Sequence, residues 1–100
     1  MEAHDDDLRI STDHSGTVFV AGEVDLAGAP ALDAALRAWG DHVVRIDMSK
    51  VTFLDSTGVN VLIAAVHERH GGSVVLERIS APALRTLEIA GVLPLFERAA

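Results

Sequence analysis

Hydrophobic residues along this 100-residue chain follow two different spacings. Short apolar runs rich in β-branched residues at 8–12, 17–21, 43–48 and 74–76 predict strands. Between these runs, apolar residues recur every three or four positions, which predicts three helices. The apolar positions of the three helix faces are Leu32, Ala35, Leu36 and Trp39, then Val59, Leu62, Ile63 and Val66, then Ala83, Leu84, Leu87 and Ala90.

Residues with special backbone or capping properties set the expected boundaries of these helices. Gly28 and Pro30 mark the start of the first helix, and Gly40 its end. Ser56 is predicted to cap a helix that runs to His70 and stops at Gly71 and Gly72. Ser80 is predicted to cap the third helix, and Gly91 to end it.

The remaining segments predict turns and short extensions. Residues 14–16 read as the turn of an opening hairpin, and residues 22–26 are expected to leave the sheet. Residues 92–96 predict a short last strand, after which residues 97–100 are expected to fray. The resulting order, β-β-α-β-α-β-α, predicts a mixed α/β fold with a mostly parallel sheet of four to five strands and about three packed helices. The length allows one domain, residues 1–100, of which residues 1–7 are expected to form a flexible acidic N-terminus.

Composition excludes several classes of function. The net charge is −7 with only 8 Lys and Arg residues, tyrosine is absent, and Trp39 is the only tryptophan, so nucleic-acid binding is not expected. There is no cysteine, which removes disulfides and thiolate chemistry. The first residues lack the apolar core of a signal peptide, and no apolar run could cross a bilayer. We therefore expect a cytoplasmic domain, not bound to membranes and monomeric between encounters with partners.

Candidate catalytic and metal-binding patterns are weak. Gly-x-Ser-x-Gly is absent around Ser56, so a hydrolase nucleophile is not expected. His67 and His70 lack a third ligand nearby, and cationic or donor side chains are expected at a helix C-terminus for dipole reasons. Gly71 and Gly72 lack the lysine and spacing of a P-loop. The sequence therefore predicts no catalytic residue, no metal and no cofactor.

Ser56 is the most informative polar residue because it lies where a buried strand passes into a helix. Backbone N–H groups without helical partners and the helix dipole favour an anion there, so a phosphate on Ser56 would be well accommodated. A second interpretation is that Ser56 only caps the helix. We expect Ser56 to be solvent-accessible, and Leu62 and Val66 to pack against the central strand.

Three segments together carry a family resemblance. They are residues 22–26 (Gly-Glu-Val-Asp-Leu), residues 46–58, which end in Asp-Ser-Thr-Gly, and residues 84–92, which include Gly91. In this order and spacing they resemble the STAS domain of bacterial anti-sigma factor antagonists. The resemblance implies a protein without catalytic activity whose unmodified serine form binds an anti-sigma factor, itself a serine kinase of the histidine-kinase-like ATPase fold. Binding releases a sigma factor, phosphorylation ends binding, and a PP2C-type phosphatase restores it.

The resemblance also assigns roles to residues. Ser56 stands at the phosphorylated position, and Gly22, Glu23 and Asp25 match the loop beside it. The residues expected at the partner surface are these three together with Asp55, Thr57, Gly58 and Asn60. Thr57 offers a second hydroxyl, which keeps open a STAS accessory subunit of a lipid-transport ABC ATPase, where threonine is frequent at the serine position. A phosphorylation-independent scaffold in a stress-signalling assembly is a further alternative.

Overall fold

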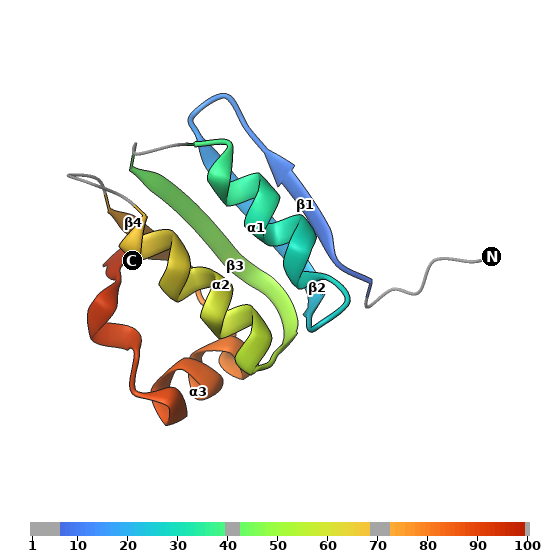
Figure 1. Cartoon of the computed structure of the whole chain (residues 1–100), viewed down its shortest axis with the longest axis vertical. Helices are drawn as coiled ribbons and strands as arrows, with labels where there is room; N and C mark the ends of the chain where they lie inside the picture. The colour runs from blue at the N-terminus through green and yellow to red at the C-terminus, as the bar shows by residue number, and fades with distance from the viewer. Residues whose placement is uncertain (1–6, 40–42, 69–72, 100) are drawn as a thin grey trace.

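The computed structural model describes residues 7–39, 43–68 and 73–99, which form five strands and three α-helices (Figure 1). The predicted helix stops at Gly40, Gly71 and Gly72, the residue His70 and most of the acidic N-terminus lie outside the described residues. The elements are β1 Arg9–Thr12, β2 Thr17–Val24, α1 Ala29–Arg37, β3 Val44–Leu54, α2 Ser56–His67, β4 Val74–Glu77, α3 Ala81–Ala90, the 3₁₀ helix η1 Leu93–Leu95, and β5 Glu97–Ala99.

The sheet has the order β1-β2-β3-β4-β5, so each new strand is added on the same side of the last. Only β1 is antiparallel to its neighbour, and β2 through β5 are parallel. Crossovers between parallel strands are right-handed, so successive crossovers in one direction place their helices on one face of the sheet. Figure 1 shows α1 and α2 side by side on that face, with α3 next to α2. The predicted mixed, mostly parallel α/β fold is confirmed.

One apolar core lies between the helices and the inward side chains of the sheet. Val18, Ile46 and Leu76 come from three adjacent strands and are fully buried. Leu32, Leu62 and Leu87, one from each helix, pack in the same cluster. The helix faces differ from the prediction in detail: Ala65 is buried, Val66 is only half-buried, and Ala90 is exposed.

Strands β2 and β3 both run further than predicted, and β3 contains two bulges. Strand β2 continues to Val24 and β3 to Leu54. Phe19 pairs with Asp47 while Ala21 pairs with Lys50, so Val20 lies opposite two residues of β3. A second shift falls between Gly22 and Glu23. Such bulges break the alternation of inward and outward side chains on which the prediction depended. Residues 44–54 were therefore not predicted as one strand.

The buried carboxylate of Asp47 lies beside the first bulge and is the centre of a small polar cluster with Ser49 and Arg78. The backbone N–H and the hydroxyl of Ser49 both donate hydrogen bonds to Asp47 Oδ1, at 2.9 and 2.7 Å. Arg78 donates to Asp47 Oδ2 through Nε at 2.8 Å and also through its terminal nitrogen. Burial acts to raise the pKa of Asp47, but the bonds from Ser49 and Arg78 outweigh it and hold the pKa below its ordinary value.

The carboxyl-terminal segment also corrects the prediction. Residues 93–95 form a 3₁₀ helix, and the last strand is Glu97–Ala99, which pairs with β4. Pro94 has no N–H to donate to a sheet, which favours the turn over a strand at this point. Phe96 is buried in the core and fixes the chain before β5. The residues expected to fray thus complete the sheet.

The second helix also ends earlier than predicted. It stops at His67, with Glu68 as its C-cap, rather than reaching His70. Its first turn lies close to the ends of β2 and β3, because Gly58 has no side chain. A Cβ at Gly58 would lie 2.6 Å from Val24 Cγ1 and 2.7 Å from Leu54 Cδ1, both in the core. Any larger residue at position 58 would therefore force Val24 and Leu54 to move.

Gly58→Ala is expected to destabilise the protein by about 1–3 kcal/mol, because the methyl group overpacks the junction. In an open helical position the same change would stabilise by up to about 1 kcal/mol. Urea unfolding of the variant measures the effect, with Asn60→Ala as the control because Asn60 is exposed in the same helix. A Gly58→Ala protein as stable as the wild type would contradict the close packing.

Asp47→Asn is expected to lower the free energy of unfolding at pH 7 by about 1–3 kcal/mol, because it removes charge-assisted hydrogen bonds to a buried carboxylate. The folded pKa of Asp47 lies below the ordinary value of 3.8, so its contribution is complete at neutral pH and is lost as the pH falls below that value. The difference between wild type and variant should therefore narrow from pH 7 to pH 3. Asp33→Asn, in an exposed pair with Arg37, is the control and should cost less than about 1 kcal/mol. An equal difference at both pH values would refute this account.

Candidate functional site

Strand β3 passes into α2 through Asp55, which is the N-cap of the helix. Asp55 has an extended backbone, and its Oδ1 accepts a hydrogen bond from the Gly58 N–H at 3.1 Å. The prediction that Ser56 caps the helix is therefore wrong by one residue, and Ser56 is the first helical residue. A carboxylate at this position both accepts the N–H and interacts favourably with the helix dipole.

The side chain of Ser56 takes no part in this helix cap. Its side chain is exposed, which confirms the predicted accessibility. The Ser56 hydroxyl makes no hydrogen bond with another residue in the described part of the chain. Because Asp55 satisfies only the Gly58 N–H, the N–H groups of Ser56 and Thr57 remain available at the helix start. The site can therefore accommodate an anion attached to Ser56.

The end of β2 lies directly beside this junction, as the resemblance implied. Val24 pairs with Leu54, and the Asp55 N–H donates to the Val24 carbonyl at 3.2 Å. Asp25 follows immediately, and its Oδ1 accepts from the N–H groups of Ala27 and Gly28, each at 3.1 Å. The structure thus places Asp25 and Asp55 at the same edge of the sheet, with Glu23 on the adjoining part of β2.

The other predicted partner-surface residues occupy different environments. Gly22 is buried and has φ +93°, a backbone conformation that only glycine adopts readily. It therefore shapes the backbone of β2 and presents no side chain to a partner. Gly58 is also buried, and Thr57 is half-buried. Asn60 is exposed one turn after Ser56. Ser56 and Asn60 are thus the two predicted residues on α2 that present their side chains to solvent.

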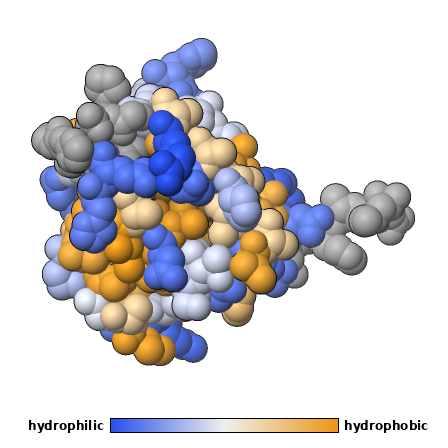
Figure 2. All heavy atoms as spheres, viewed as in Figure 1, coloured by the Kyte–Doolittle hydropathy of each residue, from blue (hydrophilic) through white to orange (hydrophobic). Residues whose placement is uncertain are grey.

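An apolar groove between α2 and α3 begins at Ser56 and was not predicted from the sequence. It has a volume of about 550 Å³ and is lined by Ser56, Val59, Asn60, Ile63, Thr86, Ile89, Ala90 and Val92. Ile89 is 81% exposed at its border. Figure 2 shows hydrophobic residues gathered at the lower left of the molecule, over α3 and the segment that follows it and beside α2. The one sequence signal was that Ile89 falls outside the inward stripe of its helix.

Thr86 fixes the wall of this groove relative to Ser56. Its hydroxyl donates to the Leu54 carbonyl at 3.0 Å, which ties the middle of α3 to the last residue of β3. Ser80, the predicted and observed N-cap of α3, donates its N–H to the Met48 carbonyl at 3.1 Å. Two contacts therefore hold α3 against β3, and the groove and the serine form one surface.

Two further properties of the described residues bear on the site. Across residues 7–39, 43–68 and 73–99, no group of three or more histidine or acidic side chains is placed to hold a metal ion. His67 is the exposed last residue of α2, and its predicted companion His70 lies outside those ranges. Over the same ranges, none of the helices combines the length and apolar character needed to cross a bilayer.

Comparison with known proteins agrees with this geometry. The family model described as "Mlab, STAS domain" matches residues 9–95. The chain is 35% identical over 91 residues to the anti-sigma-B factor antagonist of Listeria monocytogenes, covering 86% of this chain and 79% of that protein.

Solved structures show the same fold. An anti-sigma factor antagonist from Mycobacterium paratuberculosis superposes with a TM-score of 0.78 at 30% identity, covering 97% of this chain and 89% of the other. The Bacillus cell fate determinant SpoIIAA in its phosphorylated form has a TM-score of 0.66 at 18% identity, covering 94% and 92%, and shares the fold. The chain therefore belongs to the STAS-domain family of anti-sigma factor antagonists.

Proposed function

We propose that this chain frees a sigma factor by binding an anti-sigma factor through the surface around unmodified Ser56, and that phosphorylation of Ser56 ends this binding. The observation that supports the proposal most directly is the exposed Ser56 hydroxyl, which Asp55 leaves free by capping the helix. The proposed partner is a serine kinase of the histidine-kinase-like ATPase fold, and a PP2C-type phosphatase reverses the modification. The chain acts in the cytoplasm as a monomer without catalytic activity of its own.

The negative charge of the phosphate explains why phosphorylation of Ser56 would end binding of the anti-sigma factor. A phosphate adds about −1.5 to −2 charges, and the start of α2 tolerates them because its N–H groups and dipole favour an anion. In a complex the same phosphate is desolvated next to Glu23, Asp25 and Asp55, which already make this edge acidic. A penalty of about 3 kcal/mol would weaken binding on the order of a hundredfold. The partner can therefore be released without any change in the fold.

The apolar groove supplies the contact area for the same partner. Ile89 is 81% exposed beside it, and Leu26 in the loop after β2 is 74% exposed. Large apolar side chains surrounded by polar groups are typical of the centre of a protein interface. Since the groove begins at Ser56, an anti-sigma factor seated in it would also cover the serine. One surface then serves for binding and for phosphate transfer.

The relatives favour this function over the alternatives. The Listeria monocytogenes protein is described as an anti-sigma-B factor antagonist and the Mycobacterium paratuberculosis protein as an anti-sigma factor antagonist. SpoIIAA, of the same fold, takes a phosphorylated form. A transporter subunit or a phosphorylation-independent scaffold would not require a free serine hydroxyl at the start of α2. Co-purification separates these functions, since the expected partner is a kinase-like ATPase rather than a transporter ATPase.

Intact-mass measurement after incubation with the cognate anti-sigma factor and ATP tests the phosphorylation site. Wild type and Thr57→Ala should each gain one phosphate, whereas Ser56→Ala should gain none. Ser56→Ala should still bind the anti-sigma factor. Because Asp55 is the cap, Ser56→Ala should change stability by less than about 0.5 kcal/mol, while Asp55→Ala should cost about 0.5–2 kcal/mol. Phosphate transfer to Ser56→Ala but not to Thr57→Ala would move the site to Thr57.

Ile89→Asp is expected to weaken binding of the anti-sigma factor at least about tenfold, because a charge replaces an apolar contact at the border of the groove. Its unfolding free energy should stay within about 0.5 kcal/mol of the wild type, since the side chain is exposed. Val43→Asp is the matched control, because Val43 is 51% exposed and directly precedes β3, at the end of the strand away from α2. Equal affinities of the two variants, measured by calorimetry, would remove the groove from the interface.

A further inference from the structure

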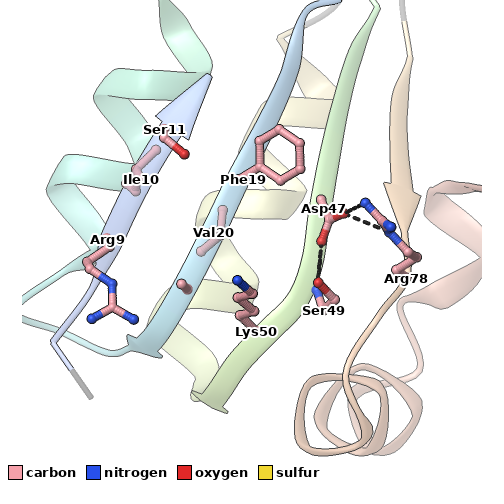
Figure 3. A pocket seen from close by; sticks show the side chains of 10 residues that line it. Arg9, Ile10, Ser11, Phe19, Val20, Asp47, Ser49, Lys50 and Arg78 are labelled. Atoms are coloured by element: carbon pink, nitrogen blue, oxygen red, sulfur yellow. Dashed lines mark hydrogen bonds and ion pairs between the residues drawn. The ribbon is translucent and has the colours of Figure 1, made fainter. Parts of the chain in front are cut away.

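The face of the sheet opposite α1 and α2 carries a hollow that the proposed function does not use. It has a volume of about 650 Å³ and lies over β1, β2 and β3, with Arg78 at its edge (Figure 3). In Figure 3 the ribbons of α1 and α2 lie behind the strands, and the side chains of Phe19, Asp47 and Arg78 lie on the near side. Volumes of about 300–1,000 Å³ are typical of small-molecule sites.

Two cations flank a small residue in this hollow. Ala21 pairs with Arg9 on one side and with Lys50 on the other, so the three residues form one row across β1, β2 and β3. Adjacent strands lie about 4.8 Å apart, which places the Arg9 and Lys50 backbones about 10 Å from each other. Both long side chains line the hollow, and the methyl group of Ala21 leaves the space between them open.

The bulge in β3 is the reason that Lys50 takes part. With regular alternation after Asp47, residue 50 would lie on the helix-covered face. The extra residue opposite Val20 instead brings Lys50 into register with Ala21. Neither Arg9 nor Lys50 forms an ion pair with another residue of the described ranges. In a chain of net charge −7, two such cations at one hollow attract an anion.

The neighbouring row provides an apolar surface beside the cations. Phe19 pairs with Ser11 on β1 and with Asp47 on β3, and its half-buried ring lines the hollow. Asp47 would repel an anion, but both its oxygens are engaged by Ser49 and Arg78. Arg78 adopts φ +48°, an unusual backbone for a residue with a side chain, and its side chain remains 62% exposed. The hollow thus combines positive charge with an aromatic wall.

We propose that this hollow binds a small aromatic anion, with its carboxylate or phosphate group between Arg9 and Lys50 and its ring against Phe19. Paired charge on the anion and stacking on the ring are the two contacts that these side chains offer. The site is on the other face of the sheet from α2, so the inference goes beyond the proposed switch and does not depend on Ser56. A result that refutes phosphorylation would leave it unchanged.

Titration of the full chain with phenyl phosphate, followed by backbone NMR shifts at low salt, tests the proposal. We expect saturable shifts centred on Phe19, Ala21 and Lys50, with a Kd of about 1 mM for a ligand of this size. Benzoate should bind at the same place, and phenol and inorganic phosphate should each bind at least about tenfold more weakly, because each lacks one of the two contacts.

Variants separate this site from general electrostatic attraction. Lys50→Gln and Arg9→Gln should each weaken phenyl phosphate about five- to tenfold, by loss of one charge-assisted contact. Arg45→Gln is the matched control, because Arg45 is on β3, outside the residues lining the hollow, and is paired with Glu77. It should change the Kd by less than about twofold. An equal loss in all three variants, equal binding of phenol or inorganic phosphate, or shifts centred on the start of α2 would overturn the proposal.

Discussion

The addition of each parallel strand on the same side of the previous one is the constraint on which the structure depends. Right-handed crossovers then place the helices on one face and bring the carboxyl ends of the parallel strands to one edge. That edge is where β2 ends at Val24 and β3 at Leu54, and where α2 begins. The serine and the acidic loop meet there because the topology brings their strands together. The same constraint leaves the other face of the sheet without these helices.

At the junction of β3 and α2, neighbouring residues divide the structural and chemical roles. Asp55 caps the helix, and Gly58 allows the helix to approach Val24. Ser56 lies between them, and its side chain takes part in neither contact. A serine that capped the helix itself would have its hydroxyl oxygen engaged with the backbone. The residue preceding Ser56 therefore determines that the hydroxyl is available to a partner.

The sequence predicted the elements whose signals are local. The presence of the three helices, the Ser80 cap and the Gly91 stop were predicted correctly because each depends on a few adjacent residues. The full length of β3 was missed because bulges interrupt its alternation. The last strand was predicted too early in the chain, at residues 92–96, since β5 is stabilised by pairing with β4 rather than by its own composition. The place of Ser56 near the loop of Asp25 followed from the family resemblance. The groove at Ile89 could not be predicted, because it depends on how α3 lies against α2.

The bulge opposite Val20 also determines where β3 can tolerate the deletion of one residue. Met48 and Ser49 together occupy the space of one residue in the pairing with β2, and Lys50 resumes the alternation. A chain lacking Ser49 would still pair residue 50 with Ala21, so Val51 and the later side chains of β3 would keep their present faces. The middle of the central strand is thus a position at which a one-residue deletion preserves the core, whereas in a regular strand the same deletion would turn every following side chain to the opposite face.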